Sequence, residues 1–185
     1  MYQIGDLVWQ VDGTTGVVES VEAMPVQQRM YNLTVDIAHT FFVGQQGWLV
    51  HNACSYSSIT GYADRLESVS AYVTPNDLGT GQATNLASRL WARAMGKSTD
   101  DAGHAVSKKL GGLLTDNIFP QSVNINRGAY RQFELQLAEL ITQTGNPASI
   151  NIQFIYDTAS STRPTSIIYE ATINGNIFSQ VFSNP

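Results

Sequence analysis

Three histidines, His39, His51 and His104, are the only ones among the 185 residues, and each stands in a setting that could do chemistry. Histidine is the side chain that most readily takes up or gives a proton near neutral pH. His51 follows an apolar stretch and directly precedes Asn52, whereas His104 ends the sequence Asp101-Ala102-Gly103-His104. The two regions predict two separate chemistries, which we take in turn.

The His51-Asn52 pair predicts cleavage of the peptide bond after Asn52. An asparagine side-chain amide can attack its own carbonyl carbon and form a succinimide, and a neighbouring histidine can polarise the carbonyl that is attacked. His39 could activate the Asn52 amide if the β segments around residues 40–43 and 48–50 fold together. The alternative is an ordinary strand end with a capping His-Asn pair.

The stretch 100–134 predicts hydrolysis of phosphodiester bonds. Asn126, Tyr130 and Glu134 are spaced four apart, so on a helix they face one side. An amide oxygen and a carboxylate are hard ligands that suit Mg²⁺, which keeps most of its waters and binds substrate phosphate. His104 is the only histidine of the second part and the only candidate for a base that takes a proton from water. The structural alternatives are a turn histidine, an N-cap asparagine and a solvated glutamate.

Charge is unevenly distributed along this acidic chain, whose net charge is −5. The window 89–131 holds seven bases and three acids, a net of +4. A positive stretch in an acidic chain indicates an anion-binding cleft, although a solvated charged face gives the same pattern. We expect Lys108, Arg127 and Arg131 to bind substrate phosphate.

Composition excludes several classes of protein. One cysteine, Cys54, excludes an internal disulfide framework and a multi-cysteine zinc site. No apolar run is long enough for a membrane helix, so we expect no membrane partner, and no signal peptide is visible at the N-terminus. The acidic balance argues mildly against a DNA-coating protein.

Hydrophobic patterning predicts two domains of different class. Residues 1–52 read as short β segments, with strands expected over 6–11, 16–21, 31–35, 40–43 and 48–50. Residues 53–69 are expected to be a linker, because 53–61 are small and polar, and a short helix is possible over 62–72. Residues 70–185 read as α+β, with helices over 83–95, 104–110 and, most clearly, 125–144. Strands over 150–156 and 166–173 and a C-terminal antiparallel hairpin complete that domain.

The N-terminal segments resemble the C-terminal end of a Hint (hedgehog/intein) autoprocessing domain, as found before the toxin module of bacterial polymorphic toxins. The resemblance covers residues 5–52 and rests on three strings: Met30-Tyr31-Asn32-Leu33-Thr34-Val35, His39-Thr40-Phe41-Phe42-Val43-Gly44 and Gly47-Trp48-Leu49-Val50-His51-Asn52. It implies that His39, His51 and Asn52 release the downstream part. The family's nucleophilic cysteine has no counterpart here, which implies a fragment of a longer protein.

The second part resembles the non-specific DNA/RNA endonuclease family, which has the ββα-metal (His-Me finger) fold. The resemblance covers about residues 70–185 and rests on Asp101-Ala102-Gly103-His104, Leu110-Gly111-Gly112, Asn117-Ile118-Phe119-Pro120-Gln121 and the segment from Asn126 to Glu134. It implies that His104 is the general base, that Asn126 is the one direct Mg²⁺ (or Mn²⁺) ligand and that Glu134 supports metal-bound waters. It also implies catalytic roles for the Asn117 amide and for Asp101 of the first string.

Two departures from the family pattern concern basic residues. The family's common Asp-Arg-Gly-His is Asp-Ala-Gly-His here, so Ala102 removes a phosphate-binding arginine. A basic residue that the family carries downstream of the glutamate is not evident, since Ala138 and Glu139 stand in that region. Lys108, Arg127 or Arg131 are the candidates to replace the lost arginine.

The resemblances imply a secreted polymorphic toxin that degrades nucleic acid in the cytoplasm of a target cell and is held inactive by a cognate immunity protein. DNA and RNA both stay open as substrates, because hydrolysis directed at the backbone reads no base edges. The metal could be Mg²⁺, Mn²⁺ or Ca²⁺. Two alternatives also stay open: a protein-processing module with an inactive nuclease-like cargo domain, and a nuclease scaffold that binds nucleic acid without turnover.

Overall fold

The computed structural model describes residues 4–5, 7–10, 12–20, 40–43, 48–51, 55–114 and 116–185. The chain divides into two compact units, Met1–Ala53 and Cys54–Pro185, and each is described by itself. The division lies one residue from the boundary expected after Asn52.

The N-terminal unit contains two antiparallel ladders. β1 (Leu7–Trp9) pairs with β2 (Thr15–Val17), and β3 (Thr40–Val43) pairs with β4 (Trp48–His51). Asp12 closes the β1–β2 turn by accepting a 2.9 Å hydrogen bond from the Thr14 backbone N–H. The β segments predicted at these places are confirmed, whereas the strand predicted over 31–35 lies outside the described residues, as do His39 and Asn52.

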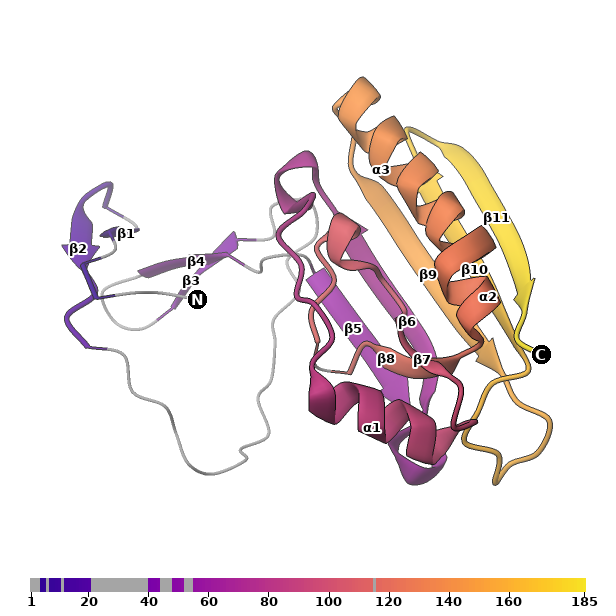
Figure 1. Ribbon diagram of the computed structural model, residues 1–185. Helices are drawn as coiled ribbons and strands as arrows, with labels where there is room; N and C mark the ends of the chain where they lie inside the picture. The colour runs from indigo at the N-terminus through magenta and orange to yellow at the C-terminus, as the bar shows by residue number, and fades with distance from the viewer. Residues whose placement is uncertain are drawn as a thin grey trace. The chain divides into compact units, whose positions relative to one another are not determined.

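A five-stranded antiparallel sheet in the order β11-β10-β9-β6-β5 is the framework of the second unit (Figure 1). Its strands are β5 (Ser55–Thr60), β6 (Leu66–Val73), β9 (Ala148–Ile155), β10 (Ser166–Ile173) and β11 (Asn176–Ser183). The predicted C-terminal strands and hairpin are confirmed. Asn174 and Gly175, with φ of 49° and 77°, form the two-residue turn between β10 and β11.

The segment expected to be a linker, 53–69, is instead part of the sheet. β5 and the first half of β6 occupy it, and the helix considered over 62–72 is the strand β6. The reason is visible in β6, where the buried Val69, Ala71 and Val73 alternate with Ser68, Ser70 and Tyr72 on the other face. Short hydroxyl side chains suit the solvent face of a strand, and composition alone does not separate such a strand from a polar linker.

The core lies between one face of this sheet and the helices. Alternate residues of β6, β9 and β10 are buried, and α3 lies along this face (Figure 1). Aromatic side chains join the layers, since the Tyr130 ring lies 5.5 Å from Tyr169 and 4.8 Å from Phe182, and the Phe133 ring lies 5.2 Å from Tyr169. The helix that carries the candidate site is therefore fixed to the sheet.

The remaining elements lie between the strands in sequence. They are α1 (Leu86–Met95), the ladder of β7 (Asp101–His104) with β8 (Ile118–Gln121), α2 (Val123–Ile125), the π-helical turn η4 (Asn126–Tyr130), α3 (Arg131–Thr144) and the 3₁₀ turns η1 (Tyr62–Asp64), η2 (Pro75–Asp77) and η3 (Lys108–Leu110). None of the helices in the described ranges is long and apolar enough to cross a membrane.

The helix predicted over 125–144 is interrupted near its start. The turn η4 is π-helical, and Gly128 has non-helical angles of φ −104° and ψ −112°. Single π-helical turns of this kind are frequent at functional sites. The regular part, α3, ends where Gly145 adopts the left-handed conformation at φ 68°, as the Gly-Asn-Pro sequence predicted.

The helix predicted over 104–110 is mostly wrong, because His104 ends a strand and only η3 is helical. Gly111 caps η3 in the left-handed conformation at φ 83°. A Cβ on Gly112 would lie 1.7 Å from the Val106 carbonyl oxygen, so only glycine permits the chain to pass there. The Leu110-Gly111-Gly112 string thus folds the chain back against Val106 and Ser107, shortly after His104.

A buried polar cluster anchors the start of β7. The Arg163 guanidinium binds the buried Asp100 carboxylate through Nε–Oδ2 at 2.7 Å and Nη2–Oδ1 at 3.0 Å. The same guanidinium donates to the Asn184 carbonyl at 2.7 Å, and the Asn184 amide donates to the Pro120 carbonyl of β8 at 3.1 Å. The loop before β10, the C-terminal segment and the β7–β8 ladder are therefore tied together next to the candidate site.

Candidate active site

One cavity of about 700 Å³ collects most of the side chains to which the sequence assigned chemistry. Its walls come from the loop before α1, from β7, from the η3 turn and from the η4–α3 segment. The lining residues are Gly79, Gly81, Ala83, Thr84, Ala102, His104, Ser107, Lys108, Lys109, Asn126, Arg127, Arg131, Glu134 and Leu135. Six predicted site residues are among them, whereas Asp101 and Asn117 are not.

His104 reaches the cavity from the last position of β7, opposite Ile118 in the ladder. Burial lowers its pKa below the ordinary value of 6.5, the positive charge of Lys108 also lowers it, and a backbone hydrogen bond with Gln82 acts in the opposite direction. The imidazole is therefore neutral at neutral pH. Its Nε2 atom is buried and has no hydrogen-bond partner. A neutral imidazole that donates one N–H has a lone pair on its other nitrogen, which is the requirement for a general base.

Asn126 is oriented by Asp101. The Asn126 Nδ2 donates to Asp101 Oδ2 at 2.9 Å, and Arg127 binds the same carboxylate through both Nε, at 2.8 Å, and Nη2, at 2.9 Å. The Arg127 and Asn126 hydrogen bonds lower the pKa of Asp101, so this carboxyl is ionised and can only accept. The amide nitrogen of Asn126 must therefore face Asp101, and its oxygen Oδ1 is the end left for a cation.

Glu134, in the first turn of α3, is only 5% exposed although it lines the cavity. Its Oε1 accepts a 2.8 Å hydrogen bond from the Ser107 backbone N–H. Burial raises its pKa from 4.5 to about 8, and the Ser107 hydrogen bond offsets only part of that effect. In the protein without a cation this carboxyl holds a proton at pH 7, and a positive charge in the cavity would favour its ionised form.

The basic side chains around the cavity fall into two groups. The guanidinium of Arg127 is engaged by Asp101. Lys108, Lys109 and Arg131 are exposed residues of the cavity wall, where an anion could reach them. Ala102, which stands where the family has an arginine, is buried in the same wall.

Asn117 does not take the place in the cavity that was expected of it. Its fully buried amide accepts from the Val106 N–H at 2.8 Å and donates to the Val106 and Leu113 carbonyls at 2.9 Å and 2.6 Å. Every part of the amide is thus engaged by backbone groups, and its oxygen also accepts from the Tyr56 hydroxyl at 3.3 Å. These contacts hold the turn after His104, whereas a catalytic role of the Asn117 amide stays a prediction.

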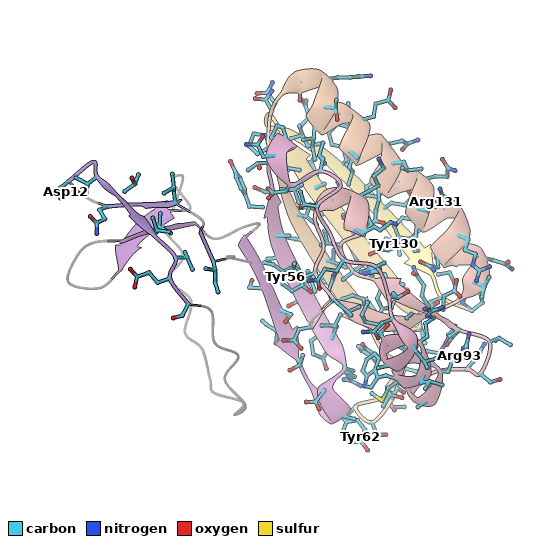
Figure 2. All side chains as sticks on the ribbon, turned by 60° about the vertical axis from the view of Figure 1, so that its left-hand side comes forward. Asp12, Tyr56, Tyr62, Arg93, Tyr130 and Arg131 are labelled. Carbon is cyan, nitrogen blue, oxygen red and sulfur yellow. The ribbon has the colours of Figure 1, made fainter. Side chains whose placement is uncertain are left out.

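Tyr130 also departs from the expectation that it would face the same way as Asn126 and Glu134. It is buried between α3 and the sheet, and its hydroxyl donates to the Ala105 carbonyl at 2.7 Å (Figure 2). The four-residue spacing assumed a regular helix, which the π-helical turn at Asn126–Tyr130 breaks. Tyr130 instead fixes the residue that follows His104.

Sequence reasoning missed Ser107, Lys109 and the loop 79–84 as parts of the site. Ser107 contributes a backbone N–H, which no sequence pattern reveals, and the glycine-rich loop indicated only a turn. Lys109 stood in the basic window next to Lys108, and that adjacency was the one available signal. Among the residues that the structure describes, no three His, Cys, Asp or Glu side chains gather so as to hold an ion.

The pKa of Glu134 predicts how the stability of the metal-free protein depends on pH. Because folding raises this pKa from 4.5 to about 8, the stabilising contribution is complete below 4.5 and is lost as pH rises through 8. Between pH 6.5 and 8.5 we expect the free energy of unfolding to fall by roughly 2 kcal/mol. His104 does not add to this fall. Because folding lowers its pKa below 6.5, its contribution to the free energy of unfolding is lost only as pH drops below this window.

The measurement is urea unfolding in EDTA at several pH values, for the wild type, Glu134→Gln and Glu139→Gln. Glu139 is an exposed glutamate on the same helix and serves as the matched control. We expect Glu134→Gln to flatten the pH dependence and Glu139→Gln to preserve it. Equal slopes for Glu134→Gln and the wild type would contradict the buried-carboxyl account.

Comparisons with known proteins identify the family of this chain. The family model described as DNA/RNA non-specific endonuclease matches residues 50–175. A curated relative, "Probable deoxyribonuclease RhsA" of Dickeya dadantii (strain 3937), is 42% identical over 120 residues. That match covers 63% of this chain and 8% of the relative, so the chain spans less than a tenth of the relative's length.

Solved nuclease structures share the fold at low identity. NucA from Streptococcus agalactiae with no metal bound has a TM-score of 0.54 at 14% identity, over 73% of this chain and 72% of that one. The Sda1 nuclease with bound zinc ion has a TM-score of 0.53 at 14% identity, over 77% and 78%. The family model covers more than half of the chain, and every residue that lines the cavity lies within the match. This chain therefore belongs to the DNA/RNA non-specific endonuclease family.

Proposed function

We propose that the second unit is a metal-dependent nuclease that hydrolyses phosphodiester bonds of DNA or RNA with little discrimination between bases. The observation that carries the proposal is the single cavity that contains His104, Asn126 and Glu134 inside a basic rim. DNA is the first substrate to test, because the 42% identical relative is named a deoxyribonuclease.

His104 would act as the general base. Its imidazole, which burial keeps neutral, can accept a proton from a water molecule that attacks phosphorus. The P–O bond to the leaving oxygen breaks as the new P–O bond forms, and a water molecule would protonate the leaving oxygen. Lys108, Lys109 and Arg131 would hold the phosphate over the cavity through charge-assisted hydrogen bonds. One of these cations would also replace the arginine that Ala102 lacks. In this scheme the protein contacts only the phosphate backbone of the nucleic acid. We therefore expect cleavage to depend little on the base sequence.

The residues present fit a divalent cation, Mg²⁺ or Mn²⁺. Asn126 would bind it through Oδ1, because its Nδ2 is committed to Asp101, and Glu134 would accept hydrogen bonds from water around it. When bound, such a cation supplies Lewis-acid stabilisation of the charge that develops on the phosphate oxygens. Asp101 contributes by orienting Asn126 rather than by touching substrate.

The role of His104 is tested by cleavage of plasmid DNA and of RNA by the full chain. We expect His104→Ala to lower the rate by about 10²–10⁴-fold, the usual contribution of a general base, and EDTA to abolish cleavage. His51→Ala replaces a histidine at the end of β4 in the other unit, and it should leave the rate of nucleic-acid cleavage unchanged. Cleavage that persists in His104→Ala, or binding of nucleic acid without any turnover by the wild type, would contradict the proposal.

We propose further that this nuclease is the toxic part of a larger secreted polymorphic toxin that acts in the cytoplasm of a target cell. The support is the relative RhsA, of which the match covers only 8%, so that the nuclease is a small portion of a long protein there. A cognate immunity protein is the partner that such a toxin would need in the producing cell.

Autoprocessing by the N-terminal unit is a second candidate function. It is favoured by the β3–β4 ladder, which pairs Thr40 with His51. The segments that end next to His39 and Asn52 are therefore partners in one ladder, which is the condition that the proposed Hint-type cleavage requires. In this alternative the nuclease-like unit is an inactive cargo.

Mass spectrometry of the purified chain tests this second candidate. We expect a fragment that begins at Ala53 to accumulate on incubation, and Asn52→Ala to prevent it. A wild-type chain that stays intact would show that this part does not process itself, and cleavage that continues in Asn52→Ala would place the reaction elsewhere.

A further inference from the structure

The strand β11 leaves one edge of the five-stranded sheet open. It is the last strand in the order, and among the described strands only β10 pairs with it. It is eight residues long, contains no proline and carries no charged residue from Asn176 to Ser183. Natural edge strands are usually short, charged, bulged or covered, because their unpaired backbone groups are a template for another strand.

The hairpin turn determines which backbone groups point outward. The two-residue turn closes on the pair Ile173 and Asn176, which exchange both hydrogen bonds, and the pairs then alternate along the ladder. The N–H and C=O groups of Asn176, Phe178, Gln180 and Phe182 therefore point to β10. Those of Ile177, Ser179, Val181 and Ser183 point away from the sheet.

Two of the residues whose backbone groups point away from β10 also carry exposed apolar side chains. These side chains lie on the uncovered face of the sheet, which is the face opposite α3. Ile177 is 66% exposed and Val181 is 64% exposed. Phe178, on the opposite face of β11, lines a cavity of about 370 Å³ together with α3 residues that include Phe133, Leu137 and Leu140. A strand added at this edge would find exposed apolar side chains on one face and, on the other, this cavity, which Gln136, Glu139 and Gln143 also line.

We propose that β11 pairs with β11 of a second copy of this chain, antiparallel and around a two-fold axis at Ser179. In that register Ile177 of one copy lies opposite Val181 of the other, Ser179 lies opposite Ser179, and the outward backbone groups satisfy one another. The strand is thus complementary to itself, which is the requirement of a two-fold interface.

Charge does not oppose this pairing. The nearest acidic side chain on the uncovered face is Glu170 of β10, which is the partner of Ser179 in the ladder. In the paired sheet the two Glu170 residues would be three strand spacings apart, about 14 Å, which exceeds the Debye length of about 8 Å at physiological salt.

The opposite edge of the sheet is less suited to pairing. β5 has six residues, and its register with β6 shifts between Ile59 and Thr60. Such an irregularity bends and twists a strand and protects an edge. Ile59 is 64% exposed, as is Val181, so the two positions form a matched pair for mutation.

Sedimentation velocity of the full chain, from low micromolar to several hundred micromolar, tests the proposal. We expect the wild type to dimerise with concentration, Val181→Lys to weaken dimerisation at least tenfold and Ile59→Lys to behave as the wild type. Ser179→Pro should also give a monomer, since its N–H points outward and proline there costs no bond to β10. Circular dichroism and thermal unfolding check that the variants remain folded.

Three outcomes would overturn the proposal. They are a wild type that stays monomeric over the whole range, a dimer that survives both Val181→Lys and Ser179→Pro, and a dimer that Ile59→Lys dissociates. The first would leave the edge to a strand from another protein, the second would place the interface elsewhere, and the third would place it at β5.

Discussion

The Asp101 carboxylate is the interaction on which the candidate site depends. One ionised carboxyl receives the Asn126 amide and both arms of the Arg127 guanidinium, all within 2.9 Å. It determines which end of the amide is available to a cation. It also pairs with the charge of Arg127, whose side chain stays 69% exposed on the cavity wall. A neutral residue at this position would leave the Asn126 amide free to turn.

Burial shifts the pKa values of His104 and Glu134 in opposite directions. It lowers the pKa of His104, which is therefore neutral and able to accept a proton, and it raises the pKa of Glu134 to about 8. Both shifts arise because the cavity wall is poorly solvated, so the charged forms are disfavoured. A bound cation would lower the pKa of Glu134 again and would leave the His104 imidazole neutral. In the proposed function, occupation of the cavity by a cation would thus favour ionisation of Glu134.

The surrounding framework explains how a short strand and an interrupted helix hold this geometry. The Asp100–Arg163 pair anchors the residue before Asp101, while Asn117 holds the backbone of Val106 and Tyr130 that of Ala105. Asp100, Asn117 and Tyr130 are buried and Arg163 is mostly so, and all four are hydrogen-bonded to the segments that flank His104. Of these four residues only Asn117 was predicted to be catalytic, and its observed contacts are with groups behind the cavity wall.

The sequence predicted those features that repeat along the chain or depend on residue type. Alternation revealed β10 and β11, the apolar stripe revealed α3, and the rarity of histidine singled out His104. It did not predict β5, because serine-rich strands and polar linkers have the same composition. It could not foresee the backbone contacts of Asn117 or the role of Asp101, since both depend on residues distant in the chain. The π-helical turn at Gly128 was also hidden, so Tyr130 was assigned to the wrong face.

A crystal structure of the chain with Mn²⁺, with the ion located by its anomalous scattering, tests the central claim most directly. The account predicts one strong peak in the cavity, in direct contact with Asn126 Oδ1, with the amide nitrogen still bound to Asp101, and loss of that peak in Asp101→Ala. A peak remote from Asn126, or an Asn126 amide whose nitrogen faces the cavity, would contradict it.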